Sequence, residues 1–221
     1  MRSIVSFLFV MSFSLAFAQL SVSAGGSTLK GWGPQKAWAG FHVGIEIPRD
    51  DASSFYGRYT HLFHNRDVDS TYVSLIPRDP ASLPPGAVYS PLISSTASMN
   101  FHIINLGTRY YLGDGYDFGW AGYGGSDLVI TINKVRMNND PYDEALYVVD
   151  EYSRYDGSAF TLGFGLTGGV KYSRPPMGTF YFDAGLSYLL LYQPNNPYLY
   201  SNMINQLTFN FNLGFRKDIL W

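Results

Sequence analysis

The feature that most constrains this chain is a strict alternation of apolar with small or polar residues over unusually long segments. In residues 160–172 one set of alternate positions is apolar almost throughout, whereas the other set holds Thr, Gly and one Lys, and the same pattern returns in 180–192 and 203–215. Since successive side chains of a strand point to opposite faces, each segment predicts a β-strand with one apolar face. Strands of about 13 residues exceed the usual 5 to 6 and suit a tilted bilayer crossing.

Five further segments continue the pattern, the first and last of them weakly: 19–28, 37–47, 100–112, 118–132 and 54–63. Short turns and long polar connections alternate between the eight segments. The short turns are 49–53, 113–117 and 174–178. The long connections are 29–36, 64–98, 133–156 and 193–202. This order predicts an all-β fold, an eight-stranded antiparallel up-and-down transmembrane β-barrel with short periplasmic turns and long extracellular loops.

The apolar face of these strands is expected to meet lipid and not a protein core. Only 14% of the residues are charged, against about 25% in a soluble domain, and the second face carries small and polar groups. A soluble barrel that holds a lipid is the alternative, but its outer face would normally be rich in charge. Aromatic residues near segment ends are expected to form the two interfacial girdles: Trp38, Tyr59, Phe63, Tyr110, Tyr111, Phe118, Trp120, Tyr172, Tyr188, Tyr192 and Trp221.

The N-terminus reads as an export signal. Arg2 is followed by an apolar stretch from Ile4 to Phe17, and Ala16-Phe17-Ala18 fits the small-x-small cleavage rule. We therefore expect a signal peptide at 1–18 and one outer-membrane β-barrel domain at 19–221. The chain has no Cys, which excludes disulfides, Cys-based metal sites and Cys nucleophiles. No basic stripe suggests a nucleic-acid partner, and no apolar run is long enough for a membrane helix.

Several short motifs resemble a known family. They are Gly25-Gly26-Ser27-Thr28-Leu29, the run from Ala39 to Pro48, Arg109-Tyr110-Tyr111-Leu112-Gly113, and the closing Leu213-Gly214-Phe215-Arg216. Together they resemble the porin-like outer-membrane β-barrel domain proteins of Bacteroidota, which include PorT-like barrels associated with type IX secretion. The chain departs from that pattern in its last residues, 217–221, and in the long loop 64–98. The resemblance implies an outer-membrane location and no enzyme activity.

Charged side chains on the inward parity are expected to fill the barrel. They are Glu46, Arg58, Arg109, Lys171 and Asp183, and the bulky Tyr56, Tyr123 and Tyr181 share the inward parity. An ion or proton path is the functional alternative, but an eight-stranded barrel is only wide enough to be packed by side chains. Because buried charges must be paired, we expect Asp183 to have a cationic neighbour on an adjacent strand. If the turn 174–178 is symmetric, Lys171 lies opposite Tyr181 and on the diagonal from Asp183, and we predict that Lys171 is this neighbour.

No residue set predicts catalysis, a cofactor or a metal. His61 and His64 differ by three positions and so do not share a strand face, and His42 and His102 lie apart in the sequence. A hydrolase could be imagined from His64, Asp67, Asp69 and Ser70, yet no nucleophile motif supports it. The acidic stretch 138–144, with Asp150 and Glu151, offers oxygen ligands for Ca²⁺ without the spacing of an EF-hand. A solvated loop is the preferred interpretation.

Function is expected to reside in the long loops. The loop 64–98 holds several prolines but is too apolar for a solvated segment, so its apolar side chains should dock on the barrel rim, on other loops or on another outer-membrane protein. The leading hypothesis is a structural or accessory subunit that binds a partner outer-membrane protein through loops 64–98 and 133–156. The alternative is a small porin-like transport or ligand-binding barrel.

Overall fold

The computed structural model describes residues 19–31, 37–113, 115–154, 156–196, 199 and 206–220, without the side chains of 66–70 and 220. The proposed signal peptide, 1–18, lies outside this range, as does Trp221. Eight long strands make up the barrel: β1 (Leu20–Gly31), β2 (Ala37–Asp50), β3 (Ser53–Pro77), β4 (Leu92–Gly113), β5 (Gly119–Asn139), β7 (Gly157–Arg174), β8 (Gly178–Pro194) and β9 (Leu207–Leu220). A three-residue strand, β6 (Tyr147–Val149), and two 3₁₀ turns, η1 (Pro80–Ser82) and η2 (Glu151–Ser153), lie in the connections.

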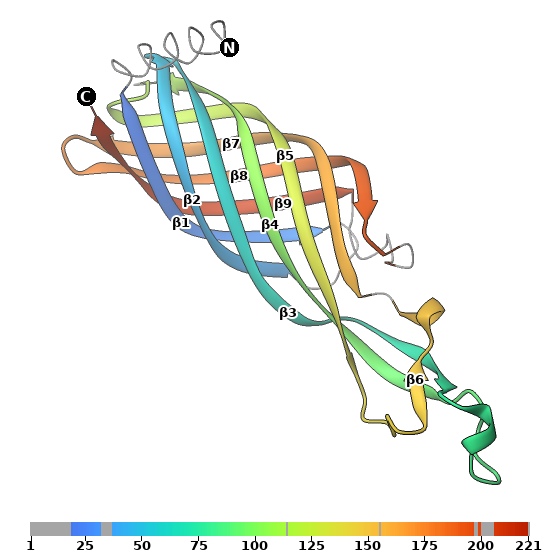
Figure 1. Ribbon diagram of the computed structural model, residues 1–221. Helices are drawn as coiled ribbons and strands as arrows, with labels where there is room; N and C mark the ends of the chain where they lie inside the picture. The colour runs from blue at the N-terminus through green and yellow to red at the C-terminus, as the bar shows by residue number, and fades with distance from the viewer. Residues whose placement is uncertain are drawn as a thin grey trace, which may run out of the picture.

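All strand pairs are antiparallel, and the sheet closes on itself. The order is β2-β1-β9-β8-β7-β5-β4-β3-β6, with a further pairing between β2 and β3. That pairing joins the two ends of the eight-stranded sheet, and the strands follow the chain order around the ring (Figure 1). The predicted fold class is therefore confirmed. Closure removes the sheet edges, so the backbone polar groups of these strands are satisfied within the barrel. In the described part of the chain, no helix is long and apolar enough to cross a membrane.

Strand parity follows the sequence pattern. Phe164 and Leu166 on β7 are about two-thirds exposed, while Leu186 and Phe182 on β8 are also exposed to the outside. The inward set predicted from parity is buried throughout: Glu46, Tyr56, Arg58, Arg109, Tyr123, Lys171, Tyr181 and Asp183. The exposed belt of Phe, Leu, Ile and Val around a closed polar-lined ring is the arrangement of a lipid-embedded barrel.

Three aromatic residues assigned to the girdles point inward instead. An irregularity in the pairing of β7 with β8 turns Tyr192 toward the apolar core, where it is partly buried. Trp38 is 2% exposed and donates its indole N–H to the carbonyl of Met99 at 3.0 Å, and Tyr111 is also buried. Both lie on the inward parity of their strands, next to outward Ala37 and Tyr110. The prediction used nearness to a segment end and ignored parity. By contrast, Tyr110, Phe118 and Trp120 are exposed at the end of the barrel that carries the short turns, as an interfacial girdle requires.

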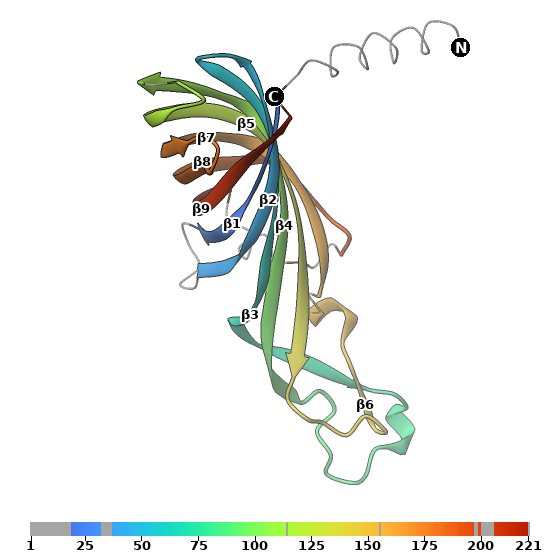
Figure 2. The same ribbon diagram turned by 90° about the vertical axis from the view of Figure 1, so that its left-hand side faces the viewer.

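The long loops are partly sheet, which corrects the boundaries expected from the sequence. β3 continues to Pro77, β4 begins at Leu92 and β5 continues to Asn139. These extensions run well past the rest of the barrel and carry β6 at their side (Figures 1 and 2). We call residues 66–98 and 136–154 the extracellular lobe. Polar loop residues did not stop the strands because each extension finds a hydrogen-bonding neighbour, β3 with β4 and β4 with β5.

Candidate functional site

The barrel interior contains three layers of side chains. Nearest the short turns, Tyr111, Tyr116 and Tyr123 form an aromatic layer with Ala121. At the lobe end, an apolar layer includes Trp38, Leu62, Phe101 and Val129 and continues into the buried face of the lobe. Between these two lies a network of charged groups. The sequence predicted small and polar inward residues but not this apolar layer, whose members come from most strands of the barrel.

Asp183 on β8 is the centre of the ionic layer. Both of its carboxylate oxygens accept from the Arg58 guanidinium, at 2.6 and 3.1 Å, and Arg109 donates to Oδ2 at 3.2 Å. The Tyr123 hydroxyl at 3.0 Å and the Asn212 amide at 2.6 Å complete its shell. The negative charge is thus saturated by two cations and two neutral donors, which is the condition for holding a carboxylate away from water.

Glu46 on β2 forms the second acidic centre. It accepts from Ser54 Oγ at 2.5 Å, from Arg109 Nη1 at 3.0 Å and from the Tyr111 hydroxyl, and Arg216 Nη1 lies 3.3 Å from Oε2. Arg109 therefore joins the two carboxylates. Its guanidinium also lies 4.2 Å from the centroid of the Tyr56 ring, a favourable cation–π geometry. Arg216 was missed by the sequence argument, although it continues the inward parity of Asn210, Asn212 and Gly214.

The predicted Lys171–Asp183 pair is wrong. The register was predicted correctly, because Lys171 is paired with Tyr181 and Gly169 with Asp183. However, the Lys171 ammonium turns toward the short-turn end, where it donates to the carbonyls of Tyr116 and Phe118, at 2.8 and 3.2 Å, and to Ser173 Oγ at 2.9 Å. The prediction considered only the neighbouring strand, whereas the cations that reach Asp183 come from across the lumen.

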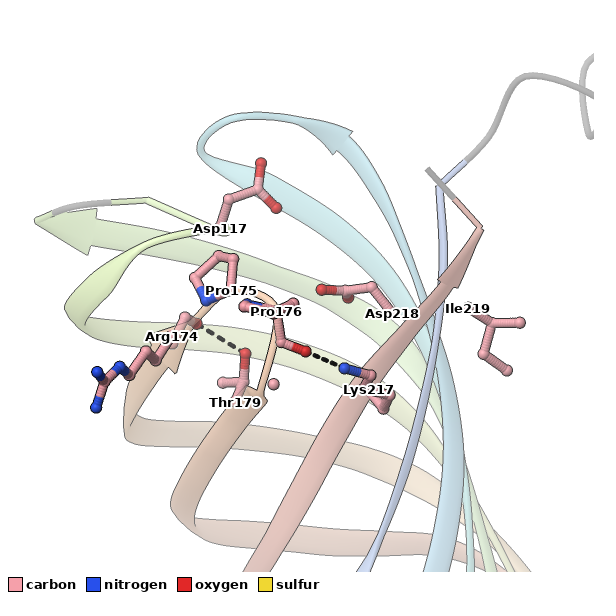
Figure 3. A pocket seen from close by; sticks show the side chains of 10 residues that line it. Asp117, Arg174, Pro175, Pro176, Thr179, Lys217, Asp218 and Ile219 are labelled. Atoms are coloured by element: carbon pink, nitrogen blue, oxygen red, sulfur yellow. Dashed lines mark hydrogen bonds between the residues drawn. The ribbon is translucent and has the colours of Figure 1, made fainter.

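A small pocket of about 270 Å³ lies at the short-turn end, between the turn 175–177 and the end of β9 (Figure 3). Lys217 bonds to the carbonyl of Pro176, and Ser173 and Thr179 are hydrogen-bonded at 2.7 Å. The carboxylates of Asp117 and Asp218 accept from Gln19 at 3.3 Å and from Ser21, respectively. These polar groups close the mouth of the barrel around the start of β1, so the pocket is part of the structural seal.

The extracellular lobe has two different faces. One face is buried, with Val73, Leu75 and Ala97 almost fully covered. The other face carries exposed apolar side chains, which we call the lobe patch: Tyr72, Ile76, Leu92 and Val148. The strand register places these residues on the same face. Tyr72, Ser74 and Ile76 are alternate residues of β3, and they lie opposite Ser94, Leu92 and Val148, respectively. Val88 and Tyr89, in the adjoining 83–91 loop, are exposed as well. Tyr147 also holds the 83–91 loop against β6 through the carbonyl of Val88, at 2.8 Å. The predicted docking of loop apolar groups is thus partly satisfied within the lobe.

The other residues weighed from the sequence have ordinary surroundings. The carboxylates of Asp143 and Asp150 in the acidic stretch accept backbone N–H groups of Ala145 and Tyr152, at 2.9 and 3.2 Å, and so stabilise turns. The side chains of Asp67, Asp69 and Ser70 lie outside those described, which leaves the imagined hydrolase set untested. Across the described residues, no three His, Cys, Asp or Glu side chains are grouped to hold a metal ion.

Comparison with known proteins shows that the fold is similar to those of solved outer-membrane proteins. No protein-family model matches the chain, and no curated protein matches it. Among solved structures, Neisserial surface protein A is similar, with 13% identity, a TM-score of 0.52, and coverage of 91% of this chain and 97% of that one. A major outer membrane protein from Thermus thermophilus has 11% identity and a TM-score of 0.50, with 92% and 100% coverage. The closed barrel, its apolar outer belt and its meander topology thus define an integral β-barrel of the cell outer membrane.

Proposed function

We propose that this protein is a non-enzymatic, non-conducting outer-membrane barrel that acts as an accessory subunit and binds a partner outer-membrane protein through its extracellular lobe. The observation that carries the proposal is the lobe patch. Tyr72 and Leu92 are each more than 60% exposed, and the strand register places both on one face of a sheet that already buries its other face. Exposed aromatic and aliphatic side chains on a rigid element are typical anchors of protein interfaces.

The position of the patch favours a membrane-bound partner. The lobe continues β3, β4 and β5 directly beyond the end of the other strands, so the patch is held on the outer side of the barrel (Figure 2). A second barrel in the same membrane would meet this face while diffusing in two dimensions. The resemblance to Bacteroidota barrels associated with secretion agrees with such a role, and we keep membership of that family as part of the proposal.

The filled interior argues against the alternative of a transport barrel. A solute would have to pass the apolar layer, then the Arg58–Asp183–Arg109–Glu46 network and finally the aromatic layer. Opening that path would leave buried charges without partners, at a cost of several kcal/mol for each ion. The barrel is better suited to anchor the lobe than to conduct.

The proposal is tested by isolating the protein from native membranes in mild detergent. We expect a complex of fixed stoichiometry that contains a second outer-membrane protein. The double variant Tyr72→Lys/Leu92→Lys should lose this partner while its barrel remains folded and heat-modifiable. A matched control, Asp51→Lys, changes an exposed residue in the opposite, short-turn end of the barrel and should keep the partner.

A photo-crosslinking amino acid at position 72 should give one discrete adduct in cells, and the same group at position 51 should not give that adduct. A solitary wild-type barrel, or a complex that survives the Tyr72→Lys/Leu92→Lys substitutions, would refute the proposal.

A further inference from the structure

Two histidines that are distant in the sequence face each other on the outside of the barrel. His61 on β3 lies directly opposite His102 on β4, and their ring centroids are 4.7 Å apart, with 3.4 Å between the two Nδ1 atoms. The hydroxyl of Tyr59, on the same outward parity, lies 2.7 Å from His102 Nδ1. Neither the ionic network nor the lobe patch uses these three side chains.

The amide of Asn100 lies beside the second ring nitrogen of His102. Asn100 is 8% exposed, and within the described residues its Oδ1 has no hydrogen-bond partner, while its Nδ2 is placed 3.4 Å from His102 Nε2. Oxygen and nitrogen of an amide are assigned from their hydrogen bonds. Exchanging them puts Oδ1 beside His102 Nε2, where it can accept an Nε2–H group, and leaves Nδ2 at the position without a partner. The Nδ1 of His102 then carries a lone pair directed at Tyr59 and His61.

In this tautomer the donors and acceptors of the three side chains are not matched. The single lone pair of His102 Nδ1 can accept the Tyr59 hydroxyl or a proton on His61, but not both. If His61 Nδ1 is also unprotonated, two lone pairs face each other. A cation placed between the rings would relieve this conflict. In addition, two nitrogen ligands about 2.0–2.1 Å from a tetrahedral Zn²⁺ lie about 3.4 Å apart, which matches the separation of the two Nδ1 atoms.

We propose that His61 and His102 form a binding site for a divalent transition metal of the Zn²⁺, Cu²⁺ or Ni²⁺ class, with Tyr59 as a third donor and Asn100 as the positioning residue. Imidazole nitrogen is a preferred ligand of these ions, and Mg²⁺ and Ca²⁺ prefer oxygen. A hydrogen bond from the second ring nitrogen to a carbonyl is the usual support of a metal-bound histidine, and Asn100 Oδ1 is placed to accept it. Water would complete the coordination.

The site lies on the outward face of the barrel, toward its lobe end. His61 is eight residues beyond Ser53, the first residue of β3, which places it roughly 20 Å from the short turns and near the outer edge of an apolar band about 25 Å tall. Phe41 and Phe63 pack on the His61 ring, with centroids 5.6 Å away in both cases. This packing fixes the ring beside His102 without enclosing it. A metal here would clamp β3 to β4 just below the lobe.

The test titrates the purified, tag-free barrel in detergent with Zn²⁺ alone and, separately, with Cu²⁺ alone. We expect saturable binding of one ion per chain, with two nitrogen ligands in the Cu²⁺ electron paramagnetic resonance spectrum. His61→Gln and His102→Gln should each weaken binding at least tenfold, and His64→Gln, at an exposed histidine outside the pair, should not. An excess of Mg²⁺ should not compete.

Asn100 provides a readout that a merely structural role would not give. Asn100→Ala should weaken Zn²⁺ binding by about 10- to 100-fold, and Asn100→Asp, which keeps the acceptor, should restore it. Each variant is first checked for the heat-modifiable barrel. The site is disproved if the wild type takes up no stoichiometric metal, or if binding survives His61→Gln and His102→Gln together.

Discussion

Arg58 and Asp183 form a bidentate ion pair across the lumen, with Nη–Oδ distances of 2.6 and 3.1 Å. They belong to β3 and β8, between which β4, β5 and β7 intervene in the sheet. The pair therefore connects opposite walls of the barrel, and both side chains are at most 5% exposed. Such a contact can form only after the barrel has closed, so it ties the ionic layer to the complete fold.

The Arg58–Asp183 pair should show strong coupling in a double-mutant cycle. Asp183→Leu alone leaves Arg58 without its main counter-ion and should cost about 3–5 kcal/mol of unfolding free energy. Asp183→Leu with Arg58→Met should cost clearly less than the sum of the single changes. The measurement is urea unfolding of the barrel in lipid vesicles. Combining Asp183→Leu with Lys171→Met is the control, and its effects should add within about 0.5 kcal/mol. Additive effects in the first cycle would contradict the assignment.

Two neighbouring glycines on β7 should respond differently to the same substitution. A Cβ on inward Gly169 would lie 2.6 Å from both Tyr123 Cζ and the carbonyl oxygen of Phe182, whereas a Cβ on outward Gly168 would have its nearest neighbour at 4.0 Å. Overpacking of this kind costs about 1–3 kcal/mol. Gly169→Ala should therefore lower the unfolding free energy by that amount, and Gly168→Ala should leave it nearly unchanged. Equal effects at both positions would show that the parity of β7 is wrong.

The outward face should be inaccessible to water-soluble reagents. The chain has no Cys, so a single introduced Cys is the only thiol of the protein that can be labelled. Phe164→Cys and Leu186→Cys should resist a charged maleimide in native membranes, and a fluorophore placed there should be quenched by lipid-borne quenchers. Tyr72→Cys in the lobe patch is the positive control and should label readily. Rapid labelling at positions 164 and 186 would exclude the lipid belt.

The belt can also be tested by energetics. Phe164→Arg places a charge in the hydrocarbon and should cost roughly 2–4 kcal/mol if the residue lies near the midplane. The unfolding free energy in vesicles measures this cost directly. A surface facing water would tolerate the same change within about 0.5 kcal/mol, and that result would contradict the membrane assignment.

The isolated barrel should not conduct ions. Planar-bilayer recordings of the wild type are expected to show no steady single-channel current, because three packed layers fill the lumen. Asp183→Ala/Arg58→Ala removes the central pair and is the variant in which intermittent currents should arise first. Steady wild-type currents would revive the transport alternative.

The sequence alone determined everything that follows from local periodicity. Alternation assigned eight strands and correctly directed Tyr56, Arg58, Tyr123 and Tyr181 inward, since the direction of a side chain depends only on its position along its own strand. The expectation of a symmetric turn at 174–178 likewise placed Lys171 opposite Tyr181. Trp38 and Tyr111 were assigned to the interfacial girdles because they lie near segment ends, without regard to parity, and that prediction was wrong.

The tertiary structure decided which inward groups meet and where the strands stop. Asp183 selects Arg58 and Arg109 because barrel closure and strand tilt bring distant walls together, which no single hairpin reveals. His61 meets His102 only through the register of β3 and β4, whose connecting segment is too long for turn chemistry to specify. The strand extensions of the lobe exist for the same reason: each backbone continues as long as its neighbour offers hydrogen bonds, and that depends on the partner strand and not on the residue itself.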